Sequence, residues 1–185
     1  MDYASIFAQG LPYHDFLAKH GNDQQREKWA AMHAQIQLSE EQQKLLGTFK
    51  REMPVLVLAG AWCGDCVDQC PIFEHFASAA PVIRLHYFDR DQAVEFAPLV
   101  KICGGARVPA VLFLSEDFQE VARFGDRTLA KYRYILEKTT GETCSTGIAV
   151  KSPLQSQVQQ EWLDQFERAQ LILRTSPRLR QKHGD

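Results

Sequence analysis

Apolar residues at helical spacing dominate the first fifty residues of the chain. Pro12 can open a short helix that ends at Gly21, and Asp23 can cap a second helix. Ser39 followed by Gln42 fits a capping box, in which each side chain bonds the backbone N–H of the other residue at the start of a helix. This pattern predicts a mainly helical N-terminal segment before the first strand.

The middle of the chain changes to strand-like patterning. Residues 55–60, VLVLAG, form an unbroken apolar run of the kind that is buried on both faces of a sheet. The further predicted elements are a helix that starts in the next stretch, a strand over 82–88, a helix over 93–101, strands over 110–114 and 120–124, and an amphipathic helix over 127–138. This order combines a parallel crossover with a terminal hairpin. It therefore predicts an α/β fold with a central mixed sheet of about four strands.

Helical additions are expected at both ends of one central domain. The predicted parts are an N-terminal helical extension over 1–44, a central domain over 45–140, and a C-terminal loop and helix over 141–185 that pack on the same domain. Ser152 and Pro153 would begin the last helix, whose apolar stripe consists of Val158, Trp162, Phe166 and Ala169. Such a stripe is typical of a face buried in the core, although the added helices could instead cover a partner.

Composition and charge are those of an ordinary globular protein. Of the 185 residues, 45% are hydrophobic and 24% are charged, and the formal net charge is -2. This balance favours neither nucleic acid nor an anionic membrane as a partner. The sequence has no run of ~18 apolar residues. Its start, MDYASIFAQG, shows neither a basic leader nor a cleavage site for export, so a cytoplasmic location is predicted.

Three of the five cysteines lie in one short stretch, GAWCGDCVDQCPIF, over residues 60–73. In a reducing cytoplasm such clustering points to catalysis or metal binding rather than to structural disulfides. A C-x-x-C motif alone fits a zinc half-site as well as a redox pair. Here a buried strand leads to Cys63 and a helix begins within the motif, so Cys63 is expected at a helix N-terminus with a lowered thiol pKa. Cys66, one turn later, would be more buried yet close enough for a disulfide.

The segments VLVLAGAWCGDCVDQCP and RVPAVLFL together resemble the thioredoxin family, over roughly residues 45–140. The positions that match the family pattern are Trp62, Gly64, Pro71, the Val108–Pro109 pair before the hairpin, and Gly125. The resemblance implies a thioredoxin fold with added N- and C-terminal helices, in which a cis-proline faces the two cysteines. The flanking helices lie outside the common family domain.

The same resemblance implies a thiol–disulfide oxidoreductase. Cys63 would attack a substrate disulfide, and Cys66 would resolve the mixed disulfide. Substrate binding would fall to Trp62, Gly64, Val108 and Pro109, the last in cis. The implied partners are disulfide-containing client proteins and an electron donor, either a reductase or a low-molecular-weight thiol. No cofactor is implied.

Two positions depart from the family pattern. Asp65 stands where relatives commonly have proline, and its carboxylate would either oppose thiolate formation by like charge or simply suit the first turn of a helix. Val57 stands where relatives carry a buried aspartate for proton relay. These departures keep open a second hypothesis, a non-catalytic thioredoxin-fold module that senses oxidation or docks a partner through its extra helices.

The remaining cysteines are candidate auxiliary thiols. Cys70, one turn after Cys66, is expected to be a small buried helix residue rather than a redox thiol or a metal ligand. Cys103 lies six residues before Pro109 and could approach the thiol pair, although an ordinary loop cysteine is the simpler interpretation. Cys144 falls in a polar loop and is expected to be exposed. Because there is no second C-x-x-C motif, no metal site is predicted.

Overall fold

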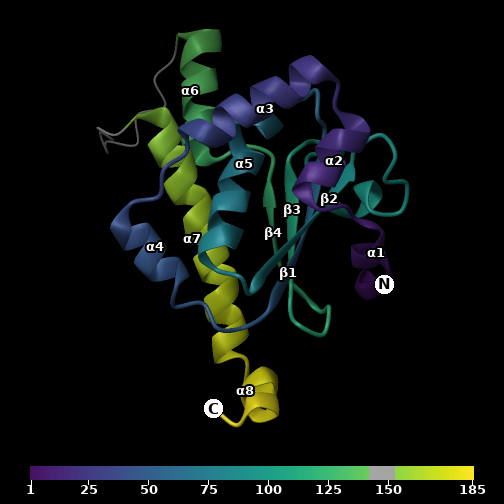
Figure 1. Cartoon of the computed structure of the whole chain (residues 1–185), viewed down its shortest axis with the longest axis vertical. Helices are drawn as coiled ribbons and strands as arrows, with labels where there is room; N and C mark the ends of the chain where they lie inside the picture. The colour runs from purple at the N-terminus through teal and green to yellow at the C-terminus, as the bar shows by residue number, and fades with distance from the viewer. Residues whose placement is uncertain (142–152) are drawn as a thin grey trace.

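A four-stranded mixed sheet forms the centre of the computed structural model, which describes residues 1–141 and 153–185 (Figure 1). The strand order is β2-β1-β3-β4, with β1 (Met53–Ala59), β2 (Ile83–Asp89), β3 (Ala110–Leu114) and β4 (Glu120–Gly125). β2 is parallel to β1, whereas β3 is antiparallel to β1 and β4 is antiparallel to β3. The predicted parallel crossover and terminal hairpin are confirmed.

Helices and loops cover both faces of the sheet, which is why β1 is buried along its whole length. On one face, α5 (Gly64–Ala79) contacts β2 and α7 (Leu154–Thr175) contacts β4, and the two helices also touch each other. The other face is covered by α1 (Tyr3–Gln9) and by the segment after β2. Buried Phe7 and Phe96 from these segments pack against side chains of β2.

Three further helices precede the sheet, namely α2 (Tyr13–His20), α3 (Asp23–Gln35) and α4 (Glu40–Leu46). α2 packs on β2 and α3 on α5, so the extra N-terminal helices share the hydrophobic core of the sheet. The predicted capping box of Ser39 and Gln42 opens α4. α3, however, is capped by Asn22 rather than by the predicted Asp23. The Asn22 side chain accepts the Gln25 N–H, and the Gln25 side chain accepts the Asn22 N–H.

The predicted helix over 93–101 does not form as an α-helix. Only one 3-10 turn, η1 (Ala97–Val100), is present there. Pro98 has no N–H to donate and its ring crowds the preceding turn, which disfavours continuation of the longer helix at this residue. The segment instead buries Phe96 and Val100 in the core. The sequence pattern also did not predict α1.

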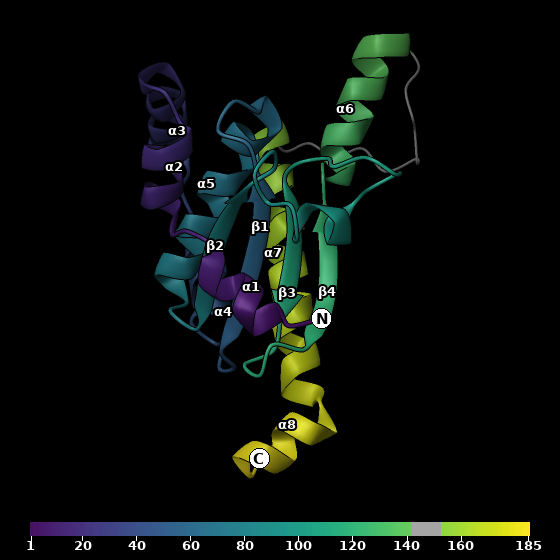
Figure 2. The ribbon, with the colours of Figure 1, turned by 90° about the vertical axis from the view of Figure 1, so that its right-hand side faces the viewer.

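The C-terminal part of the described chain is helical. It consists of α6 (Leu129–Thr140), α7 and the unpredicted α8 (Pro177–His183), and Figure 2 shows α6 and α8 at opposite ends of the sheet. The apolar stripe along α7 is buried as predicted, at Val158, Trp162, Phe166 and Ala169. The predicted cap Ser152 and the exposure expected for Cys144 lie outside the described residues.

Candidate functional site

Cys63 lies at the junction between the central strand and α5. β1 ends at Ala59, and Cys63 caps the helix with an extended backbone (φ -83°, ψ 122°). The Cys63 carbonyl accepts the N–H of Cys66 at 3.1 Å and that of Val67 at 3.0 Å, which starts the first helical turn. Cys63 is half-buried and Cys66 is fully buried, so the expected arrangement of an outer and an inner thiol is present.

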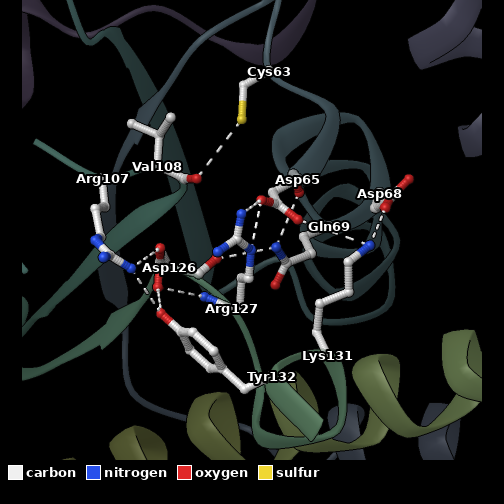
Figure 3. Close-up of polar contacts among 10 residues, drawn as sticks. All are labelled: Cys63, Asp65, Asp68, Gln69, Arg107, Val108, Asp126, Arg127, Lys131 and Tyr132. Atoms are coloured by element: carbon white, nitrogen blue, oxygen red, sulfur yellow. Dashed lines mark hydrogen bonds and ion pairs between the residues drawn. The ribbon is translucent and has the colours of Figure 1, made fainter. Parts of the chain in front are cut away.

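The Val108–Pro109 peptide faces Cys63. This bond is cis, as predicted. The Cys63 Sγ lies 3.8 Å from the Val108 carbonyl oxygen, a contact in which a thiol is a weak donor (Figure 3). Gly125 supports this turn from β4. A Cβ at Gly125 would lie only 2.5 Å from the Pro109 carbonyl oxygen, and its φ of +153° also favours glycine.

The environment of the two thiols raises their pKa values. The hydrogen bond with Cys66 is the main reason that the pKa of Cys63 lies above its ordinary value, and burial adds to it. The backbone N–H groups of Cys66 and Asp65 lower it, as expected at a helix N-terminus, but they are outweighed. Burial is the main cause of the raised pKa of Cys66. The prediction of a lowered Cys63 pKa is therefore wrong for this dithiol, because a second thiol and burial oppose the helix start.

Trp62, the residue before Cys63, pairs with Arg90, which directly follows β2. The Trp62 residue is 47% exposed, and a Cβ at Gly60 would lie 2.7 Å from its ring. The Arg90 guanidinium carbon lies 4.3 Å from the centroid of the Trp62 ring, in a cation–π contact. The hydrogen bond with Asp91 is the main reason that the pKa of Arg90 is raised, and negative charge on Cys63 contributes. Arg90 thus places a positive charge near the sulfur, and no local sequence pattern marks it.

Asp65 is paired with cations from the segment that follows β4. Arg127 Nε and Nη2 lie 2.8 Å and 2.7 Å from one Asp65 carboxylate oxygen, and Lys131 Nζ lies 3.8 Å from the other (Figure 3). Lys131 also pairs with Asp68 at 2.5 Å. Asp65 is in the first turn of α5, as the helix-end interpretation requires. Its carboxylate is therefore balanced by charges that the sequence motif does not contain.

A buried amide connects α5 to the C-terminal helix and to the β4–α6 loop. Gln69 is fully buried and accepts the indole N–H of Trp162 in α7 at 2.7 Å. The Gln69 amide donates to the carbonyls of Asp65 and Asp126 at 3.0 Å and 3.1 Å. Sequence reasoning missed Gln69. Gln69 directly follows Asp68 in a part of α5 that mixes polar and apolar residues, so no sequence pattern marks it.

The N-terminal helices also support the site. Trp29 of α3 is fully buried and donates its indole N–H to the carbonyl of Ala61 at 2.9 Å. This bond holds the turn that leads into Cys63. Side chains from α3 and α7 thus both reach the elements that carry the thiols.

A partly buried carboxyl group occurs on α5, whereas position 57 has no carboxyl group. Val57 is fully buried within β1. Glu74 accepts a hydrogen bond of 2.9 Å from the Tyr87 hydroxyl, which also lies 3.4 Å from the carbonyl of Cys70. Burial raises the pKa of Glu74 to about 7. Because the partner comes from β2, the periodicity of α5 does not reveal this contact.

The other cysteines have different surroundings. Cys70 is fully buried on α5, as expected of a small core residue. Cys103 is exposed in a turn closed by hydrogen bonds between Ile102 and Gly105, and its approach to the thiol pair stays a prediction. Within 1–141 and 153–185, no three His, Cys, Asp or Glu side chains are grouped to hold a metal ion. In the same ranges, no helix has the length and apolar character needed to cross a membrane.

The fold and the thiol site are those of a thioredoxin-like protein, and comparison with known families supports this class. Residues 10–136 match the family described as Thioredoxin. The match spans more than half of the chain, and the protein therefore belongs to the thioredoxin family. It begins well before β1, so it includes helices that the resemblance of the motifs leaves out. Among curated proteins, none matches this chain.

Solved structures give the same fold. A protein of unknown function from Pseudomonas aeruginosa has a TM-score of 0.65 and 21% identity, covering 92% of this chain and 93% of that chain. An HIV epitope-scaffold has a TM-score of 0.60 and 20% identity, with the same coverage of 92% and 93%. Fasciola hepatica thioredoxin is 27% identical with a TM-score of 0.37, covering 51% of this chain and 88% of that chain. At this identity, the first two show a common fold over most of the chain.

Proposed function

We propose that this protein is a thiol–disulfide oxidoreductase that reduces disulfides of client proteins through a Cys63/Cys66 dithiol–disulfide cycle. One juxtaposition carries the proposal. A half-buried Cys63 at the start of α5 lies 3.8 Å from the carbonyl of the cis Val108–Pro109 unit, with a fully buried Cys66 one turn later. Membership of the thioredoxin family agrees with this chemistry.

The cycle transfers two electrons to the client. The Cys63 thiolate attacks one client sulfur, the client S–S bond breaks, and the other client sulfur leaves as a thiolate and takes up a proton. The Cys66 thiolate then attacks Cys63 Sγ, which releases the first client sulfur and forms the Cys63–Cys66 disulfide. A reductase or a low-molecular-weight thiol supplies two electrons and two protons to restore the dithiol.

Client binding would use the surface around Cys63. Trp62 is exposed beside it, and a Cβ on Gly64 would meet no described atom within 4 Å apart from its chain neighbours and the backbone of its own helix. The Val108 backbone, next to Pro109, would pair with an extended client segment by strand addition. These four residues are thus the proposed substrate-binding positions.

Insulin disulfide reduction with dithiothreitol as electron donor tests the proposal. Cys63→Ser is expected to lose all activity above the dithiothreitol background, because the attacking sulfur is absent. Cys66→Ser is expected to accumulate mixed disulfides with client proteins. Cys103→Ser, at an exposed turn, is the matched control, and it should keep wild-type activity if Cys103 is an ordinary loop cysteine. Equal rates for wild type and Cys63→Ser would reject the oxidoreductase.

A redox-sensing module is the second candidate, and the raised pKa of Cys63 favours it. A thiol that is protonated at neutral pH attacks disulfides slowly, since the thiolate is the nucleophile. The two candidates differ in turnover. A sensor would form one Cys63–Cys66 disulfide per chain with diamide and would not accelerate insulin reduction.

A further inference from the structure

Asp65 influences Cys63 in two opposite ways. Its backbone N–H, in the first turn of α5, lowers the pKa of Cys63 and so favours the thiolate. Its carboxylate is a negative charge two residues from the same sulfur and would disfavour the thiolate. The net effect on Cys63 therefore depends on what neutralises the carboxylate.

Arg127 is the main partner of the Asp65 carboxylate. Two of its guanidinium nitrogens lie 2.8 Å and 2.7 Å from Asp65 Oδ2. The Arg127 backbone N–H donates to the Asp126 carboxylate at 3.0 Å, and Asp126 is itself buried and held by Arg107 at 3.2 Å and by the Tyr132 hydroxyl (Figure 3). The backbone that carries Arg127 is thus anchored independently of Asp65.

The Asp65–Arg127 pair is partly shielded from water, which strengthens its electrostatic interactions. The Asp65 side chain is 16% exposed and the Arg127 side chain is 30% exposed. Lys131, at 3.8 Å, is a weaker partner for Asp65 because it lies closer to Asp68. Loss of Arg127 would therefore leave Asp65 largely unbalanced in a region where charge interactions are stronger than in bulk water.

The other groups that face Cys63 do not replace this function. From α5 the neighbouring titratable group is Cys66, and from the end of β2 it is Arg90, which is engaged by Asp91 and stacks on Trp62. The cis-proline turn presents the neutral Val108 carbonyl to the sulfur.

We propose that Arg127 is a positioning residue that neutralises the Asp65 carboxylate and thereby sets the fraction of Cys63 present as thiolate. Lys131 supports it. The inference rests on the proposed function only in taking Cys63 as the reacting thiol. The reactivity of Cys63 would then depend on the segment between β4 and α6, and not on the cysteine motif alone.

The test is the rate of Cys63 alkylation by iodoacetamide in the reduced full-length protein from pH 6 to pH 10, followed on the Cys63 peptide by mass spectrometry. Arg127→Met is expected to slow alkylation about tenfold at pH values below the midpoint of the rate–pH curve. This corresponds to an upward shift of that midpoint by about one pH unit. Arg127→Lys keeps the charge and is expected to stay within about threefold of wild type. Alkylation of the exposed Cys103 is the internal reference and should not change.

Asp65→Asn separates an effect through Asp65 from a direct effect of Arg127. In that background, Arg127→Met is expected to change the Cys63 rate by less than about twofold, because no carboxylate remains to be neutralised. An equal slowing in both backgrounds, or no slowing in either, overturns the inference. Alkylation needs neither client nor turnover. Failure of insulin reduction with this pattern intact would therefore count against the proposed function alone.

Discussion

Glu74→Gln is expected to make the stability of the protein less dependent on pH. Glu74 is partly buried on α5 and accepts a hydrogen bond from Tyr87 at 2.9 Å, and burial raises its pKa to about 7. A glutamine keeps an oxygen that can accept the same bond but cannot ionise. The substitution therefore removes a buried charge while preserving the shape of the side chain.

The direction and the size follow from proton linkage. The folded-state pKa of about 7 lies above the ordinary value of 4.5, so the folded protein binds the proton more tightly than the unfolded chain. The contribution of Glu74 to stability is complete below the unfolded-state pKa and is lost as the pH rises through the folded-state pKa. A difference of about 2.5 pKa units corresponds to about 3 kcal/mol at most.

Urea unfolding of the reduced protein at several pH values between 4 and 8 measures this difference. The free energy of unfolding of Glu74→Gln minus that of wild type is expected to rise by about 3 kcal/mol from pH 4 to pH 8. Subtracting wild type cancels the other groups that titrate in the same range. Glu95→Gln, at an exposed position after β2, is the matched control and should give a constant difference.

A constant difference for Glu74→Gln across this range would refute the reasoning, because it would mean that Glu74 ionises in the folded protein as it does in the unfolded chain. If the difference in the free energy of unfolding rose toward low pH instead, the sign of the effect would be reversed and the reasoning would also be refuted. A constant offset added to the expected rise would report altered packing around Tyr87 and would leave the reasoning intact.

Two further substitutions test the packing that holds the site, by urea unfolding at pH 7. Trp162→Phe leaves the buried Gln69 oxygen without its donor and opens a cavity, so a loss of about 2–4 kcal/mol is expected, against less than about 1 kcal/mol for the exposed control Trp62→Phe. Equal costs for the two tryptophans would contradict this account. Gly125→Ala places a Cβ 2.5 Å from the Pro109 carbonyl oxygen and is expected to cost about 2 kcal/mol or more. An alanine variant as stable as wild type would show that this turn relaxes freely.

The elements with strong local signals were predictable from the sequence. The apolar run at 55–60 corresponds to β1, and the strand at 110–114 is found with the same bounds. The Ser39 capping box also forms, because its hydrogen bonds join residues three positions apart. In each case the deciding interaction is either a local hydrogen bond or burial of an apolar run, and both can be recognised in the sequence.

Elements whose stability depends on tertiary burial were not predictable in the same way. Residues 93–101 carry apolar residues compatible with a helix, yet Pro98 and the burial of Phe96 in the core leave a single 3-10 turn. α1 is short, and its Phe7 stacks on His86 of the distant strand β2. A seven-residue helix has little stability of its own, so only such contacts can decide whether it forms.

The sequence by itself determined where the two thiols lie, because a strand followed directly by a helix places Cys63 at the helix start and Cys66 one turn deeper. Only the tertiary structure decided their electrostatic surroundings. Arg127 reaches Asp65 across 62 positions in the chain, and Trp162 reaches Gln69 across 93. Contacts of this kind depend on how the β4–α6 segment and α7 pack against α5, and the local order of residues contains no periodic trace of that packing.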